Sequence, residues 1–354
     1  RLYYTRKGMQ GKELVTIDPA TQAEEVLAHN LPDGWFSFAP TEDFLLFNII
    51  EEGPKKGEDL QEILVPDDRQ PGWRTRSFIH KYDLATGVFQ RLTYGHTSTS
   101  INDISDDGRY LLFTCSEREL TKRPFSTTLL YRMDLQTLDT ELLLKDPFIS
   151  YAQFSPDGKE LAFIEDRIRL MVLNLETKKV RQITDGSTWY STGGGFDYAW
   201  SPDGKWFTLE FTGNKHDPYS DIGLVSAEGG KDIINLTNSG YMSGYPHFAL
   251  DGNAILFTTE RYGMRAHASW GSLNDAMLVF LNQDAYDKYC LSKEDYELRK
   301  ELEKEQKKSA GKDTPQDKNK DKKKKDDKKD SNADENCLLY TSDAADDRIS
   351  EDLG

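Results

Sequence analysis

The sequence predicts an all-β fold, a β-propeller whose four-stranded blades repeat along the chain. A short phrase recurs, in which a bulky residue is followed by Ser-Pro-Asp-Gly and then by a strand that ends in Phe. It is clearest at Phe154–Gly158 and Trp200–Gly204, and looser copies stand at Ile104–Gly108 and Phe248–Gly252. The glycines of successive copies are 50, 46 and 48 residues apart. Four short strands repeated every 40 to 50 residues or so are typical of propeller blades.

Each copy of the phrase predicts a tight turn between two strands. Proline presets φ at the second position of a turn, aspartate bonds its own downstream backbone, and glycine supplies a positive φ without steric penalty. The strand that follows is short and apolar, as in Leu111–Thr114 and Ile255–Thr258. The residues assigned to these structural blade turns are Asp107, Gly108, Asp157, Gly158, Asp203, Gly204, Asp251 and Gly252.

Further strands complete each repeat. A third strand, such as Leu170–Leu175, precedes a second turn, and the repeat closes on a strand that ends in Leu-Thr or Ile-Thr, as in Arg91–Thr93 and Gln182–Thr184. A worn copy of the phrase at Phe38–Asp43 has lost its glycine. One such sheet cannot bury both of its faces, so WD40-like or TolB-like blades stacked radially are expected. A β-sandwich with coincidental Asp-Gly turns is the alternative.

The propeller is assigned to residues 1–290, with about five to six blades present. Residues 2–30 are interpreted as the outer strands of a first blade that is incomplete. The next unit, 35–95, is long because a polar, turn-rich insert occupies 51–76. Inserts of this kind fall in surface loops, where function tends to lie. Arginines around a tryptophan make this insert a candidate peptide-contact loop, and a solvated loop anchored by one buried Trp is the alternative. The residues concerned are Arg69, Trp73, Arg74 and Arg76.

The C-terminal part of the chain has a different composition. A charged helix is predicted over 291–309, because Ser292 can cap its N-terminus and Asp295 follows three residues later. Residues 310–336 are mostly Lys, Asp, Asn and Gln and predict a disordered linker. A lysine tether for an anionic partner is disfavoured, because interleaved aspartates cancel most of the field. Residues 337–354 are interpreted as a non-native, artefactual end without function.

Composition limits the classes of function. The 354 residues are 37% hydrophobic, enough for a sizeable core, and the formal net charge of -16 argues against nucleic acid as a partner. No apolar run of about 18 residues is present, so no membrane partner is expected. The 3 cysteines stand far apart and predict neither a disulfide framework nor a metal site.

No motif in the chain carries catalytic chemistry. There is no Gly-x-Ser-x-Gly elbow, and the Ser-x-x-Lys at Ser309–Lys312 falls in the predicted linker. His216-Asp217 and His267 near Ser269 are interpreted as ordinary blade-end residues and not as a triad. The histidines lack metal-ligand spacing, so neither a catalytic residue nor a cofactor nor a metal is predicted.

Two stretches resemble known families. Residues 51–148, with Pro66–Arg74 and Arg91–Gly95, resemble the propeller of bacterial prolyl-oligopeptidase-type serine peptidases, including dipeptidyl peptidases. Residues 154–308, with Thr188–Asp197 and Phe280–Lys288, resemble the propeller of bacterial homologues of the tricorn protease. The two meet near 154–165, where either a chimeric join or one tricorn-like chain with a divergent front half fits the sequence.

Both resemblances imply a non-catalytic propeller fragment that filters peptides for a serine peptidase domain outside this chain. They imply peptides or unfolded proteins as substrates, downstream PDZ and protease domains as partners, a homo-oligomeric parent, and a periplasmic or exported location, with a cytoplasmic one as the alternative. Two other functions remain open. One is a stand-alone TolB-like interaction propeller, and the other is a propeller enzyme with carboxylates or histidines converging in its channel.

Overall fold

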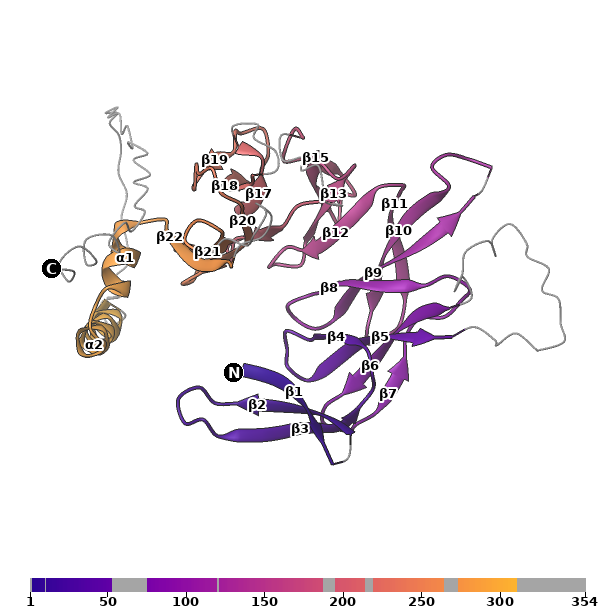
Figure 1. Ribbon diagram of the computed structural model, residues 1–354, viewed down its shortest axis with the longest axis horizontal. Coiled ribbons are helices and arrows are strands. Elements are labelled where there is room, and N and C mark those ends of the chain that lie inside the picture. The colour runs from indigo at the N-terminus through magenta and orange to yellow at the C-terminus, as the bar shows by residue number, and fades with distance from the viewer. Residues whose placement is uncertain are drawn as a thin grey trace, which may run out of the picture.

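The structure is a computed structural model that describes residues 2–9, 11–52, 75–119, 121–186, 195–213, 219–263 and 273–310, without the side chains of 303 and 305–310. Within these ranges the chain forms six antiparallel sheets and two helices. The sheets follow one another around an arc (Figure 1). This arrangement confirms the predicted all-β propeller.

The strands divide among the sheets in chain order. The first three sheets contain β1 (Leu2–Gly8), β2 (Gly11–Ile17) and β3 (Glu24–Leu31); β4 (Trp35–Phe38), β5 (Phe44–Glu51), β6 (Arg76–Asp83) and β7 (Phe89–Arg91); and β8 (Thr99–Ile104), β9 (Tyr110–Arg118), β10 (Ser126–Asp134) and β11 (Thr140–Asp146). The last three contain β12 (Ile149–Phe154), β13 (Glu160–Glu165), β14 (Arg169–Asn174) and β15 (Val180–Gln182); β16 (Tyr198–Trp200), β17 (Trp206–Phe211), β18 (Asp221–Ser226) and β19 (Ile234–Asn235); and β20 (Ser243–Ala249), β21 (Ala254–Thr259) and β22 (Asp275–Phe280).

Each complete sheet is a meander of four strands that pair in sequence order. The first strand of a sheet lies toward the inside of the arc and the last toward its outside, as β8 to β11 and β12 to β15 show (Figure 1). The first sheet has three strands, as predicted for an incomplete blade. The sixth sheet also has three described strands, and a helix follows β22.

The core is a series of interfaces between neighbouring sheets. Successive side chains of a strand point to opposite faces, so each central strand serves two interfaces. Leu45 of β5 packs toward the first sheet, whereas Leu46 packs toward the third. Likewise, Phe163 of β13 packs toward the third sheet and Ile164 toward the fifth. All four side chains are buried, and burying each stabilises the fold by roughly 1.5–3 kcal/mol.

The Ser-Pro-Asp-Gly phrase forms the predicted turn between the first two strands of a sheet. Ser155 Oγ donates to Asp157 Oδ1 at 2.7 Å, and the same carboxylate accepts from the backbone N–H of Lys159 at 3.1 Å. Gly158 follows with a φ of 68°, the left-handed conformation that favours glycine. The serine hydrogen bond holds the pKa of Asp157 below its usual value. The copies at Ser105 and Ser201 make the same serine-to-aspartate bonds.

Two copies of the turn depart from this pattern. At the fourth copy Ala249 replaces the serine, so no hydroxyl fixes the carboxylate of Asp251. There Leu250 and Asp251 both have positive φ values, 51° and 55°. In the worn copy, Glu42 takes a left-handed φ of 59° although the copy has lost its glycine. The turn therefore persists where the sequence phrase weakens.

The threonine that ends each repeat closes the sheet. Thr184 Oγ1 accepts a hydrogen bond from the backbone N–H of Leu170 at 2.9 Å, inside the fourth sheet. Thr93 and Thr237 make the same bond to Ile79 and Ile222. The threonine of each Leu-Thr or Ile-Thr ending thus accepts a hydrogen bond from a strand N–H that would otherwise lack a partner.

Two helices follow the sheets, where the sequence predicted one. The unpredicted α1 (Gln283–Tyr289) begins at Asn282, whose side chain accepts from the N–H of Ala285 at 2.9 Å. It packs on the last sheet through Tyr286 and Phe280, whose rings contact edge to face. The charged helix α2 (Lys293–Ala310) begins after Ser292, as predicted. Neither helix, within the described residues, has the length and apolarity needed to cross a bilayer.

We expect the threonine closure to be worth measurable stability. Replacing Thr184, which is 4% exposed, by valine keeps its shape but leaves the Leu170 N–H buried without an acceptor. The free energy of unfolding in urea should fall by roughly 1–3 kcal/mol. The matched control is Thr140→Val on exposed β11, which should change it by less than about 0.5 kcal/mol. Equal effects from both variants would contradict this role.

Candidate functional site

The innermost strands form the candidate site. β4, β8, β12 and β20 lie on the inner side of the arc in Figure 1. β16 is the corresponding first strand of the fifth sheet. In a propeller the innermost strands line the central channel. The side chains of these strands that face the channel are therefore the ones that a bound molecule contacts.

Three of these strands carry a bulge at the same place. The pairing register shifts between Ser150 and Gln153 in β12, between Gly244 and His247 in β20, and between residues 101 and 103 in β8. The bulges in β12 and β20 hold Tyr151 and Tyr245 at φ values of 52° and 53°. Bulky residues rarely adopt this conformation, and bulges commonly re-aim side chains beside functional sites.

The bulges coincide with exposed aromatic side chains. Tyr151 is 50% exposed and Tyr245 is 62% exposed. Trp35 of β4, also 62% exposed, occupies the same place in its repeat, three residues before the bulky residue that precedes the turn. We name Trp35, Tyr151 and Tyr245 the inner aromatic set. The sequence analysis missed them, although aligning the repeats three residues before Phe38, Phe154 and Phe248 reveals them.

Side chains join neighbouring inner strands. Asp103 Oδ2 of β8 accepts from the N–H of Phe154 in β12 at 2.7 Å. The Tyr198 hydroxyl of β16 donates to the carbonyl of Tyr151 in β12. Desolvation raises the pKa of Asp103 to about 6 and also raises that of the buried Tyr198. These polar groups replace the backbone pairing that separate sheets cannot make with one another.

A carboxylate pair lies between the fifth and sixth sheets. Glu210 Oε1 of β17 accepts from the N–H of Tyr245 at 3.0 Å, and the Glu210 N–H donates to the carbonyl of Asp197 at 2.9 Å. Gly244 permits this approach, because a Cβ there would lie 2.3 Å from Glu210 Oε1. Burial, then repulsion from Asp197, raises the pKa of Glu210 to about 7.

No Lys or Arg among the described residues pairs with the carboxylate of Asp197. Its carboxylate makes neither an ion pair nor a hydrogen bond with them, and burial raises its pKa while the nearby His247 lowers it. The channel side therefore does bring together two carboxylates and a histidine. Among the described residues, the side-chain hydrogen bonds of histidine go to Glu13 and to the carbonyl of Phe78, and none of these goes to a serine or cysteine side chain. This arrangement is suited to binding positive charge.

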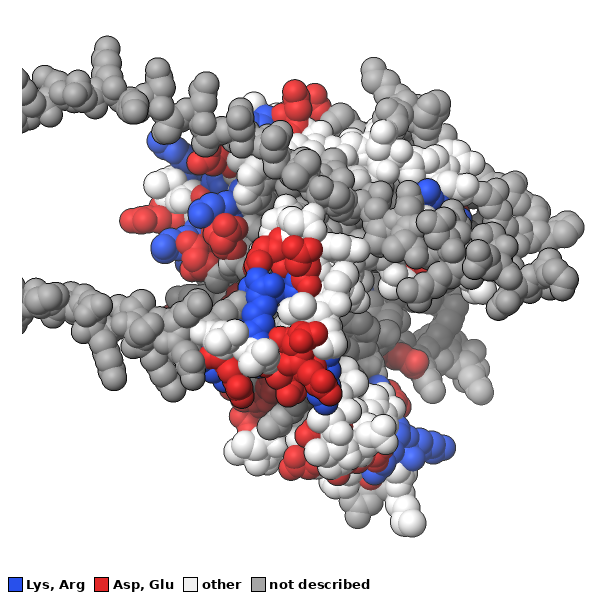
Figure 2. Space-filling model, turned by 90° about the vertical axis from the view of Figure 1, so that its left-hand side faces the viewer, with Lys and Arg blue, Asp and Glu red and all other residues white. Residues whose placement is uncertain are grey.

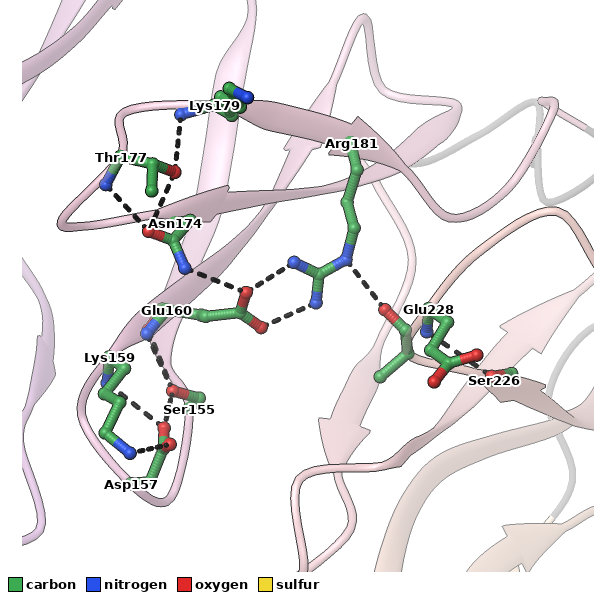
Figure 3. A network of polar contacts seen from close by, with 11 residues as sticks. Ser155, Asp157, Lys159, Glu160, Asn174, Thr177, Lys179, Arg181, Ser226 and Glu228 are labelled. Atoms are coloured by element: carbon green, nitrogen blue, oxygen red, sulfur yellow. Dashed lines mark hydrogen bonds and ion pairs between the residues drawn. The ribbon is translucent and has the colours of Figure 1, made fainter.

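A second polar network clamps the sheets on their outer side (Figure 3). Arg181, the middle residue of β15, forms a bidentate ion pair with Glu160, with N–O distances of 2.5 and 2.6 Å. Its Nε donates to the carbonyl of Ala227 in the fifth sheet at 2.9 Å. Asn174 donates to the same glutamate at 3.4 Å. This network joins two blades and is structural.

The predicted peptide-contact loop is only partly visible. Arg69, Trp73 and Arg74 lie outside the described residues. Arg76 begins β6, where its Nε donates to the carbonyl of His96 at 2.5 Å. It lines an open hollow of about 670 Å³ together with His96, Cys115 and Glu117. The structure thus places Arg76 at the edge of a hollow whose lining does not include the inner aromatic set.

The remaining candidates are scattered. His29, His80, His96 and His247 lie on four separate segments, whereas His216, Asp217, His267, Ser269 and Ser309–Lys312 fall outside the residues or side chains described, as do 311–354. The described residues contain no cluster of His, Cys, Asp and Glu suited to a metal ion. Figure 2 shows acidic and basic side chains lying next to one another over the middle of one face.

With this geometry in hand, comparison with known proteins supports the predicted resemblance. Residues 105–213 match the family described as the dipeptidyl peptidase IV N-terminal region. A prolyl endopeptidase structure superposes with a TM-score of 0.50 at 12% identity, over 78% of this chain and 39% of that one. These findings support a β-propeller of the peptidase type. The family match includes 154–165, and the chimeric join proposed there stays a prediction.

Other solved structures align with lower TM-scores. TolB from Acinetobacter baumannii aligns with a TM-score of 0.45 and 18% identity, over 78% of this chain and 60% of that one. The tricorn protease aligns with a TM-score of 0.44 and 14% identity, over 77% of this chain and 25% of that one. No curated protein matches the sequence. The chain therefore spans less than two thirds of each of these relatives.

We expect the carboxylate pair to make stability depend on pH. The pKa of Glu210 is raised from 4.5 to about 7, so the folded state holds a proton that the unfolded state releases, and stability falls as pH rises through that interval. A shift of this size corresponds to roughly 3 kcal/mol. Glu210→Gln keeps an acceptor for Tyr245 and removes the ionisation.

The measurement is urea unfolding at pH 5 and pH 8. Glu210→Gln should be more stable than the unmodified protein at pH 8, and the advantage should shrink at pH 5. The exposed Glu228, whose side chain makes no described hydrogen bond, provides the control Glu228→Gln, which should match the unmodified protein at both pH values. An advantage for Glu210→Gln that is equal at both pH values would contradict the assignment.

Proposed function

We propose that this chain is the non-catalytic propeller portion of a tricorn-like serine peptidase, which admits peptides to a protease domain and holds back folded proteins. The observation that carries the proposal is the match of residues 105–213 to a peptidase N-terminal region, in a chain whose described residues form propeller sheets. The inner layer supports it, since it offers exposed aromatic side chains for binding.

The physical basis of such a filter is the size of what can enter. An extended chain is narrow and presents side chains on both sides, whereas a folded domain buries its apolar side chains and is far wider. Exposed Tyr151 and Tyr245 can contact the apolar side chains that only an unfolded segment displays. Downstream PDZ and protease domains, a homo-oligomeric parent and a periplasmic or exported location belong to this proposal.

The proposal predicts selective binding of unfolded polypeptide. A fluorescently labelled protein that stays unfolded after its disulfides are reduced and capped should bind the chain, as measured by fluorescence anisotropy. The same protein in its native, disulfide-bonded form should bind at least tenfold more weakly, because its apolar side chains are buried. Equal binding of both forms would contradict the filter.

The same preparation should lack peptidase activity of its own. Fluorogenic peptides incubated with it should show no turnover that follows the protein through successive purification columns. Turnover that does follow it would overturn the non-catalytic assignment. Tight binding of a folded partner, without binding of unfolded chains, would instead favour a stand-alone interaction propeller.

A further inference from the structure

We propose that the inner layer selects extended segments in which a Lys or Arg is flanked by apolar side chains, with Asp197 receiving the positive charge and Tyr151 and Tyr245 the flanking groups. This inference rests on the proposed function and gives it a substrate chemistry. It depends on one continuous patch that runs from the fourth sheet to the sixth.

Contacts between its residues link the parts of this patch. The ring of Tyr151 lies over Gly195, where a Cβ would approach its carbons to 2.8 Å. Two residues later, the carbonyl of Asp197 accepts from the N–H of Glu210, whose carboxylate accepts from the N–H of Tyr245. These contacts run from the Tyr151 ring past the backbone of Asp197 and the Glu210 carboxylate to the backbone of Tyr245.

The charge of the patch indicates its ligand. Glu210 uses its carboxylate to hold β20, but Asp197 contributes only its backbone carbonyl to the described hydrogen bonds. No Lys or Arg among the described residues pairs with either carboxylate, and the one imidazole nearby, His247, is exposed. An incoming ammonium or guanidinium group would gain the ion pair that the described Lys and Arg residues do not make.

The aromatic rings suit the same ligand. Tyr151 and Tyr245 stand exposed on bulges that cost conformational energy, since both have φ values above 50°. A tyrosine face attracts apolar side chains and also cations. A folded protein keeps its apolar residues inside, so a basic residue between exposed apolar neighbours marks an unfolded segment.

The test uses labelled twelve-residue peptides and fluorescence anisotropy. The probe carries one Lys between leucines, and two companions replace this Lys by Gln or by Glu. The unmodified protein should bind the Lys peptide most tightly and the Glu peptide most weakly. Asp197→Asn should weaken the Lys peptide by about threefold to fivefold and leave the Gln peptide unchanged. An Asn variant that binds all three as the unmodified protein does would overturn the role of Asp197.

The rings are tested separately. Tyr151→Ala and Tyr245→Ala should each weaken the Lys and Gln peptides by about fivefold, whereas Tyr151→Phe and Tyr245→Phe should retain binding. Tyr296→Ala on α2, which removes a ring that is 48% exposed, is the matched control and should have no effect. If an unfolded test protein binds all variants of this chain equally, this inference is overturned and the proposed filter is not. If the unmodified chain binds no unfolded test protein, the proposed filter itself is overturned.

Discussion

The structure depends on the burial of both faces of each central strand. Leu45 and Leu46 are neighbours in β5, yet they pack against different sheets, and Phe163 and Ile164 divide in the same way in β13. A sheet taken alone would expose both of these faces. Each blade is therefore stabilised chiefly by its neighbours, and the positions of the inner strands follow from that stacking.

Separate sheets share no backbone ladder, so polar side chains must join them. On the inner side, Asp103 and Glu210 each accept a backbone N–H from the next sheet. On the outer side, Arg181 binds Glu160 in its own sheet and the carbonyl of Ala227 in the next. The inner bonds place carboxylates in partly desolvated positions, which raises the pKa values of both Asp103 and Glu210. These two carboxyl groups thus hold neighbouring blades together.

The sequence predicts what repeats and misses what does not. The Asp157 turn and the Thr184 ending recur with regular spacing, and each satisfies a local backbone group, so both can be recognised from residue types alone. The bonds made by Asp103 and Glu210 occur once each and link segments that only tertiary packing brings together. The short helix α1 was missed because its seven residues and single Asn282 cap give a weak local signal beside the longer α2. The bulges at Tyr151 and Tyr245 were predictable in part. The aromatic position repeats in the sequence, but the bulged backbone conformation is not evident from it.

Asp103 and Asp197 differ in whether a described residue bonds to the side-chain carboxylate. Asp103 accepts the N–H of Phe154, so removing its charge while keeping its shape would still leave a bond between blades. Asp197 accepts no hydrogen bond from the described residues through its side chain, and its charge raises the pKa of Glu210. An asparagine at 197 would therefore relieve repulsion without breaking a described contact. Because the charges of Asp197 and Glu210 repel each other and no described Lys or Arg pairs with them, a positively charged group bound from outside would stabilise both carboxylates.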